Sequence, residues 1–398
     1  MISEIKNDFP IFSNFKNKSF IYFDNAATTR VRDEVADKIV DVLKNNYGNP
    51  SSTHSYGRPS KSLIEVSRKE IAAHLNVSSS EIIFTSGGTE ADNLILRSAA
   101  RDLNIKHFIS SKIEHHAVTH TLDELEKDYN VKVSFVNLDE NGMVDYDNLN
   151  ELLSNSKDKC LVSLMHVNNE IGNMLDLEKV SNICLEHNAL FHSDTVQTIG
   201  HYNIDLSKTE IDFIVASAHK FHGPKGVGFA YINKSSSLRP LIFGGMQERG
   251  YRAGTESVHN IVGMSEALNI SISKLEEETK HIYDLKQYFI DKLKSSIKGV
   301  KFNGCSEDME KSTYTILNVQ FPLEKSKAEL FLFKLDLKGI ACSKGSACQS
   351  GSDAGSHVLN EVLNKDALKN VSIRFSLSVY NTKDQIDIVV NEIGNLLD

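Results

Sequence analysis

The sequence has no apolar run that approaches 18 residues, so no segment is expected to span a membrane. Residues 1–8 lack a basic region and an apolar core, and we expect no signal peptide. Five scattered cysteines in 398 residues are too few for a disulfide framework, which favours a reducing, cytoplasmic compartment. Basic residues are not in excess: the net charge of −9 argues against nucleic acid as the main partner.

The composition is that of a globular protein, with 40% hydrophobic and 24% charged residues, and the length is sufficient for two domains. Between about residues 81 and 216, short apolar strands alternate with helices. This pattern predicts an α/β domain with a largely parallel sheet that is covered on both faces. One long helix over 261–296 is expected to lead into a smaller α+β domain. We predict a large domain over 16–262 and a small domain over 1–15 and 263–398.

Polar residues follow the predicted strands at their carboxyl ends, which is where sites form in such sheets. Gly88 and Thr89 lie where a strand turns into a helix, and backbone N–H groups at such a helix start can bind phosphate. An ordinary strand–turn–helix connection is the alternative. Lys220 follows another strand, beside Ser217 and His219, and a partly desolvated lysine there is suited to covalent chemistry. The alternative is a solvated lysine in a surface turn.

A second candidate site lies in the segment 343–352. Its Gly, Ser and Ala content predicts a mobile loop that exposes the thiol of Cys348. Because an exposed free cysteine invites oxidation, a functional thiol is a better interpretation than an incidental surface cysteine. Cys342 is expected in the core. Lys344 is placed to lower the pKa of the Cys348 thiol, or it is simply exposed.

Nine motifs in order give the chain a close resemblance, over nearly its whole length, to cysteine desulfurases of the NifS/IscS-like group of the class V aminotransferase family. These enzymes depend on pyridoxal 5'-phosphate and share the fold type I (aspartate-aminotransferase-like) of the PLP-dependent transferases. The motifs are YFDNAATT at 22–29, TSGGTEADN at 85–93, EHHAV at 114–118, HVNNEIG at 166–172, SDTVQ at 193–197, SAHKFHGPKG at 217–226, QERGYRAGT at 247–255, GSAC at 345–348 and SIRFSL at 372–377.

The resemblance implies that Lys220 carries the cofactor covalently and that Asp194 faces the pyridine nitrogen. A carboxylate there keeps that nitrogen protonated, which makes the ring an electron sink. Read from the sequence alone, Asp194 could instead be a helix N-cap. His115 would stack on the ring and move protons, although spacing alone does not distinguish it from His116. The other implied cofactor contacts are Asn169 and Gln197 to the phenolate oxygen, and Gly88, Thr89, Ser217, His219 and, across a homodimer, Thr255 to the phosphate.

For the substrate, the resemblance implies that Arg374 binds the carboxylate of L-cysteine, with Asn169 beside it, and that Cys348 accepts the sulfur as a persulfide. A structural salt bridge is the alternative for Arg374. L-alanine is released, and a sulfur acceptor such as an iron–sulfur scaffold protein takes the persulfide. No metal is implied. Selenocysteine lysis or another reaction on the same fold is the alternative function, and a non-enzymatic sulfur-binding module is a second one.

The chain departs from the family pattern near the predicted nucleophile. Many relatives have serine where Lys344 stands and an aliphatic residue where Cys342 stands. The residues 353–355 replace a common Leu-Glu-Pro, so the loop geometry is open. The docking tail of longer relatives is missing, which leaves open whether a scaffold protein docks.

Overall fold

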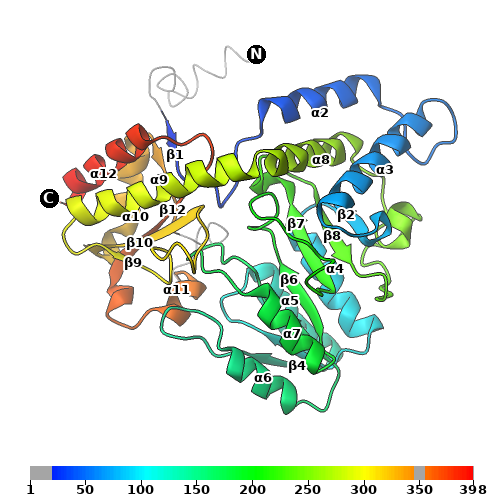
Figure 1. Ribbon diagram of the computed structural model, residues 1–398, viewed down its shortest axis with the longest axis horizontal. Coiled ribbons are helices and arrows are strands. Elements are labelled where there is room, and N and C mark those ends of the chain that lie inside the picture. Colours follow the sequence, from blue (N-terminus) through cyan, green and yellow to red (C-terminus); the bar gives the residue numbers. More distant parts are fainter. Residues whose placement is uncertain (1–19, 345–354, 398) are drawn as a thin grey trace.

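The computed structural model describes residues 20–344 and 355–397, and the structural statements below refer to these residues. A large and a small domain lie side by side, and one long helix runs along the small domain toward the large one (Figure 1). Cys348 lies outside the described residues. In the described part of the chain, no helix combines the length and the apolar composition needed to cross a membrane.

The large domain is built on a sheet of seven described strands in the order β2-β8-β7-β6-β5-β3-β4. β8 runs antiparallel to its neighbours β2 and β7, and the other pairs are parallel, as expected from the alternation of strands and helices. The carboxyl ends of six strands therefore meet at one edge. The strands are β2 (Ile82–Thr85), β3 (His107–Ser110), β4 (Lys132–Phe135), β5 (Cys160–Ser163), β6 (Leu190–Asp194), β7 (Phe213–Ser217) and β8 (Gly228–Ile232).

Helices cover both faces of this sheet, so most of its strands are buried throughout. Ile214 and Ala216 pack in a core with α2, α3, α6, α7 and α8, whereas Phe213 and Val215 point to the other face, against α4 and α5. The helices are α2 (Asp33–Asn45), α3 (Gly57–His74), α4 (Gly88–Asp102), α5 (His116–Tyr129), α6 (Tyr146–Ser154), α7 (Leu177–Glu186) and α8 (Val258–Ser273).

The small domain has a separate core around an antiparallel sheet in the order β12-β10-β9. Its elements are β9 (Lys301–Phe302), β10 (Ile316–Glu324), β12 (Asn370–Ser376), α9 (Leu275–Ser296), α10 (Ala328–Leu337), α11 (His357–Val362) and α12 (Lys383–Leu397). A short parallel pair, β1 (Ile21–Tyr22) with β11 (Ile340–Ala341), adds the N-terminal segment. The Phe23 ring packs against those of Phe289 (tilted) and Phe375 (edge to face) in this core, although the predicted division placed residues 16–262 in the large domain.

The prediction of a single helix over 261–296 is wrong, because this part of the chain forms two helices, α8 and α9, which meet at Lys274. Lys274 has non-helical φ and ψ of −108° and 11°. The Ile270 carbonyl accepts both the Ser273 hydroxyl (2.8 Å) and the N–H of Lys274 (3.1 Å). α8 packs in the large-domain core and α9 in the small-domain core, so the chain crosses between the cores at this bend. The domain limits given above stay a prediction, and we propose that the chain passes from the large to the small domain at Lys274.

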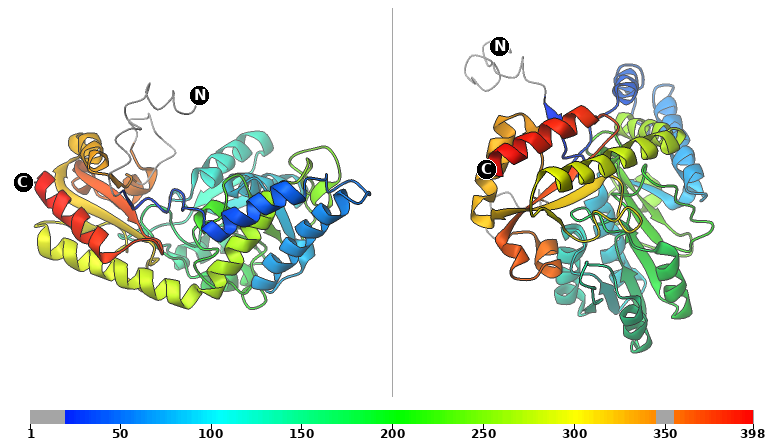
Figure 2. Two further views of the ribbon diagram at one scale, coloured as in Figure 1. Left: turned by 90° about the horizontal axis from the view of Figure 1, so that it is seen from above. Right: turned by 60° about the vertical axis from the view of Figure 1, so that its left-hand side comes forward.

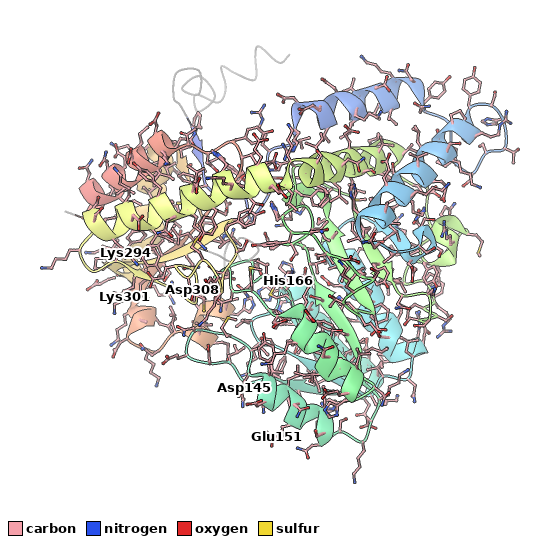
Figure 3. The ribbon with its side chains drawn as sticks, viewed as in Figure 1. Asp145, Glu151, His166, Lys294, Lys301 and Asp308 are labelled. Carbon is pink, nitrogen blue, oxygen red and sulfur yellow. The ribbon has the colours of Figure 1, made fainter. Side chains whose placement is uncertain are left out.

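Two further views separate the domains along the length of α9, whose far end lies beside α12 (Figure 2). His166 lies near the junction of the domains, while Lys294, Lys301 and Asp308 lie on the small domain (Figure 3). Asp145, which caps α6, and Glu151 lie at the end of the large domain that is remote from this junction. The segment around His166 therefore connects the sheet edge to the small domain.

Candidate functional site

A cavity of about 550 Å³ opens at the sheet edge where the strands end, and residues of both domains line it. Ten residues predicted from the sequence line this one cavity: Gly88, Thr89, His115, Asn169, Asp194, Gln197, Ser217, His219, Lys220 and Arg374. Thr255 is exposed and is not among the lining residues, and Cys348 lies outside the described residues. No cluster of three or more metal-ligating side chains occurs in residues 20–344 and 355–397.

Lys220 follows β7 in a single helical turn that aims its amine into the cavity. Its Nζ donates to the carbonyl oxygens of Ala26 (2.7 Å) and Ala27 (2.8 Å). Gln197 Nε2 donates to the same Ala26 oxygen (3.0 Å). The backbone of the 22–29 motif thus positions the amine, and sequence reasoning, which assigned no role to these carbonyls, missed that contact.

The glycine turn before α4 lets the helix start lie close to the cavity. Gly87 has a φ of +156° and precedes the first helical residue, Gly88. A Cβ atom on Gly88 would lie 2.6 Å from Cγ2 of Val196, so a larger residue would displace that side chain. The backbone N–H groups of a helix start, together with Ser217 and His219 on the same cavity wall, form a site suited to an anion.

Asp194 ends β6 as a buried carboxylate at the cavity wall. Its Oδ1 accepts a hydrogen bond from the N–H of Val196 (2.9 Å), and the element that follows β6 is strand β7, with no α-helix between them. The helix N-cap alternative for Asp194 is therefore wrong. Burial raises its pKa to about 6, against the lowering effects of the Val196 bond and the Lys220 ammonium. A buried carboxylate of this kind is stabilised by a cation placed in the cavity.

His115 caps α5, and this role fixes which of its nitrogens faces the backbone. Its Nδ1 accepts from the N–H of Ala117 (3.1 Å), so it is the unprotonated nitrogen. Burial, and then the Lys220 ammonium, lower its pKa to about 4, which keeps the imidazole neutral at pH 7. His116 also lines the cavity, but its ring packs against those of His357 (4.2 Å) and His120 (4.5 Å). The proximity to Lys220 favours His115 for proton transfer.

Arg374 comes from β12 of the small domain and is almost fully buried. One guanidinium nitrogen donates to the carbonyl of Asn169 (2.7 Å), and another forms an ion pair with Asp24 (2.9 Å). The salt-bridge alternative is therefore present, yet the same side chain also lines the cavity. Asp24 was missed as a site residue, although it belongs to the 22–29 motif, and so was the lining residue Glu170 of the 166–172 motif.

The structure describes part of the surroundings of the two remaining predicted site residues, Cys348 and Thr255. Cys342 packs against the small-domain core, as expected, and Lys344 forms an ion pair with Glu329 on α10. The loop that carries Thr255 is held to the start of α4, because Arg252 Nε donates to Glu90 (2.9 Å). Thr255 is not among the described residues that line the cavity of its own chain, and its expected role in a partner subunit stays a prediction.

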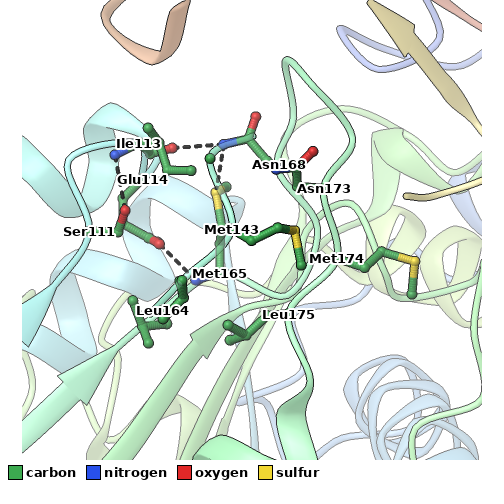
Figure 4. Close-up of a pocket in the computed structure, with 12 residues that line it drawn as sticks. Ser111, Ile113, Glu114, Met143, Leu164, Met165, Asn168, Asn173, Met174 and Leu175 are labelled. Carbon is green, nitrogen blue, oxygen red and sulfur yellow. Dashed lines mark hydrogen bonds between the residues drawn. The ribbon is translucent and has the colours of Figure 1, made fainter. Parts of the chain in front are cut away.

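A small second cavity of about 30 Å³ lies beneath the segment that bears Asn169 (Figure 4). Asn168 donates from Nδ2 to the Ile113 carbonyl (2.8 Å), and Glu114 accepts from the N–H of Met165 (2.8 Å). Both contacts join the segment after β5 to the one after β3, which carries His115. The backbone beside Asn169 is therefore held against the segment that carries His115.

Comparisons with known proteins agree in family. A family model for aminotransferase class-V matches residues 21–389. The chain is 40% identical over 383 residues to a "Cysteine desulfurase IscS" from Dictyoglomus turgidum, which covers 96% of this chain and 95% of that protein. Among solved structures, a "NIFS-LIKE PROTEIN" matches with a TM-score of 0.87 and 37% identity, over 95% of this chain and 99% of that one. A structure titled "SspA in complex with cysteine" matches with a TM-score of 0.79 and 30% identity, over 91% of this chain and 100% of that one.

Proposed function

Because the chain belongs to the class V aminotransferase family, in its NifS/IscS-like group of cysteine desulfurases, we propose that it takes sulfur from L-cysteine, releases L-alanine and holds the sulfur as a persulfide. One observation carries the proposal: a lysine, a buried carboxylate, a glycine-bounded helix start and a buried arginine line the same cavity. The observed seven-stranded, mostly parallel sheet confirms the α/β fold that was predicted from the sequence.

We propose that pyridoxal 5'-phosphate occupies this cavity. The residues present fit it: the Gly87–Gly88 turn leaves room against Val196, and among the described residues the Lys220 amine is the one cation that lowers the pKa of the buried Asp194 carboxylate. Lys220 would hold the aldehyde carbon, Gly88, Thr89, Ser217 and His219 the phosphate, and Asn169 and Gln197 the phenolate oxygen. When bound, the cofactor withdraws electrons from the substrate's Cα.

The residues around it supply binding and proton transfer. Arg374 would bind the substrate carboxylate through charge-assisted hydrogen bonds, with its direction set by Asp24. Lys220 and the neutral His115 would remove the Cα proton, since a neutral imidazole accepts a proton at pH 7. The Cys348 thiolate would attack the substrate sulfur; the carbon–sulfur bond breaks, the carbon takes a proton, and alanine and a Cys348 persulfide result.

We further propose a homodimer, a cytoplasmic location and a sulfur acceptor such as an iron–sulfur scaffold protein. Large apolar side chains support the dimer, because Tyr47 (72% exposed), Phe243 (75%) and Met246 (81%) face solvent on the α2–α3 connection and on the segment leading to Thr255. Exposed apolar side chains that form a contiguous patch often mark a protein interface. Sedimentation velocity of the purified protein tests this, and a monomer with full activity would contradict it.

The decisive experiment incubates the purified holoenzyme with L-cysteine and measures alanine and enzyme-bound persulfide. Equal amounts of both are expected in a single turnover. Cys348→Ser should bind the cofactor normally and form little alanine, because a hydroxyl is a far poorer nucleophile toward sulfur than a thiolate. Alanine formation at the parental rate by this variant would refute the role of Cys348. A requirement for a 2-oxo acid would indicate aminotransfer instead.

A further inference from the structure

The segment that bears Asn169 is a tight turn whose shape is set by hydrogen bonds within the segment itself. Val167 and Met174 pair across its base, and Asn168 Oδ1 accepts from the N–H groups of Glu170 (2.9 Å) and Ile171 (3.0 Å). The Asn168 side chain anchors the turn to the Ile113 carbonyl below it (Figure 4). The direction of the Asn169 side chain depends on the peptide planes that flank it, and the second of these, Asn169–Glu170, is followed directly by the Glu170–Ile171 plane.

The Asn169–Glu170 peptide plane and the Glu170–Ile171 plane that follows it are both held from the small domain. Asn318 on β10 and Arg374 on β12 are direct cross-strand partners. Arg374 donates to the Asn169 carbonyl (2.7 Å), and Asn318 Nδ2 donates to the next carbonyl, that of Glu170 (2.9 Å). Two adjacent side chains of one strand pair thus hold two consecutive carbonyls of the large-domain turn.

The Asn318 amide is itself fixed in orientation. It is fully buried, and its Oδ1 accepts from Asn303 Nδ2 (2.8 Å), which leaves Nδ2 as the group that faces Glu170. Asn303 Nδ2 is held in turn by the Ser372 hydroxyl (2.9 Å). A buried amide with its partners in place is rigid and costly to disturb.

We propose that Asn318 is a positioning residue for the site: it orients the Asn169 turn and couples that turn to the strand pair that presents Arg374. The roles of Asn169 and Arg374 toward cofactor and substrate rest on the function proposed above. The contact between Asn318 and the turn does not. A shift of β10 and β12 on substrate binding would move the turn that bears Asn169, because Asn318 and Arg374 are hydrogen-bonded to its carbonyls.

The test compares two isosteric substitutions on β10. Asn318→Asp keeps the shape and removes the donor to Glu170. The matched control is Gln320→Glu, because Gln320 is also buried, lies two residues further along the same strand, and donates to the Ala367 carbonyl (3.1 Å), away from the cavity. Asn303→Ala is a second variant, which releases the Asn318 amide without touching the turn. Thermal melting of each apoprotein establishes that it is folded.

Three measurements are made on each folded variant at pH 8: hydrogen exchange of peptides covering 168–174 in the apoprotein, pyridoxal 5'-phosphate affinity, and KM and kcat with L-cysteine. Asn318→Asp should speed exchange of this segment and weaken cofactor affinity, each by roughly 5- to 30-fold, because a buried carbonyl loses its donor. Asn303→Ala should act in the same direction, and Gln320→Glu should change neither.

Equal exchange in Asn318→Asp and Gln320→Glu would overturn the proposal, as would faster exchange with unchanged cofactor affinity. Failure of the proposed function has a different signature, since the parental protein would then bind no cofactor or release no alanine while the exchange difference between the two variants persisted.

Discussion

Lys286 offers a test of how the helix α9 holds the domain junction. Its side chain is fully buried, and Nζ donates to the Ser312 hydroxyl (2.8 Å) and the Thr313 carbonyl (2.7 Å). Among the described residues it forms no ion pair within 4.0 Å. Thr313 in turn donates its N–H to Gly172 (2.8 Å) of the Asn169 turn, so the lysine supports a contact between the domains.

Burial lowers the pKa of Lys286 from 10.5 to about 7, with a small opposing effect of Asp308. Between pH 7 and 10.5 the unfolded chain therefore binds one more proton than the folded chain, and stability must rise with pH in this window. Below pH 7 both states carry the proton and this dependence vanishes. From pH 7 to pH 9 the free energy of unfolding should increase by about 2 kcal/mol from this group alone.

Replacement by methionine removes the titrating amine and keeps the length of the side chain. Lys286→Met should lose that rise of about 2 kcal/mol between pH 7 and 9, whatever its absolute stability. The Thr313 carbonyl loses its donor, which costs about 1–3 kcal/mol at every pH and does not alter the slope.

The measurement is urea unfolding of the apoprotein at half-unit steps from pH 6 to 9. Lys280→Met is the matched control, since Lys280 lies on the same helix with a side chain that is 77% exposed. The control should keep the parental slope. If Lys286→Met shows the parental slope as well, the amine is not titrating in this window and the reasoning from burial fails.

Three further predictions concern the site and its support. Lys220→Ala should abolish the bound-cofactor absorbance and turnover; full activity would remove the lysine from the mechanism. Arg374→Ala should raise KM for L-cysteine by roughly 10- to 100-fold through loss of a charge-assisted pair, and Asp24→Asn should raise it less, both from initial rates; an unchanged KM in Arg374→Ala would make this arginine structural. Glu248→Gln should destabilise the fold by about 3 kcal/mol, because buried Arg68 loses its buried ion-pair partner (2.7 Å) and keeps only Glu65 (3.2 Å), whose side chain is 38% exposed. A melting temperature within a degree of the parent would contradict this.

The sequence was sufficient to place the large-domain half of the site because its strands are parallel. Thr89, His115, Asn169, Asp194 and Lys220 each follow an apolar run, and the carboxyl ends of parallel strands share one edge. Their convergence on one cavity follows from that geometry without any knowledge of the contacts. The break at Lys274 was not predicted, because it consists of one residue with non-helical φ and ψ (−108° and 11°), while the N–H of Lys274 still donates to the Ile270 carbonyl (3.1 Å).

The small-domain contribution could not be predicted in the same way. Asn318 and Arg374 are separated by 56 positions, and neither their pairing nor the carbonyls they reach can be read from local periodicity. Antiparallel register places two adjacent side chains over two consecutive peptide groups of a different domain, a relation that exists only in the folded chain. A site divided between domains therefore has two kinds of residue: those that local sequence places at a strand end, and those that only tertiary pairing brings to it. Asn318 belongs to the second kind, which is why exchange of its target turn tests it more directly than turnover does.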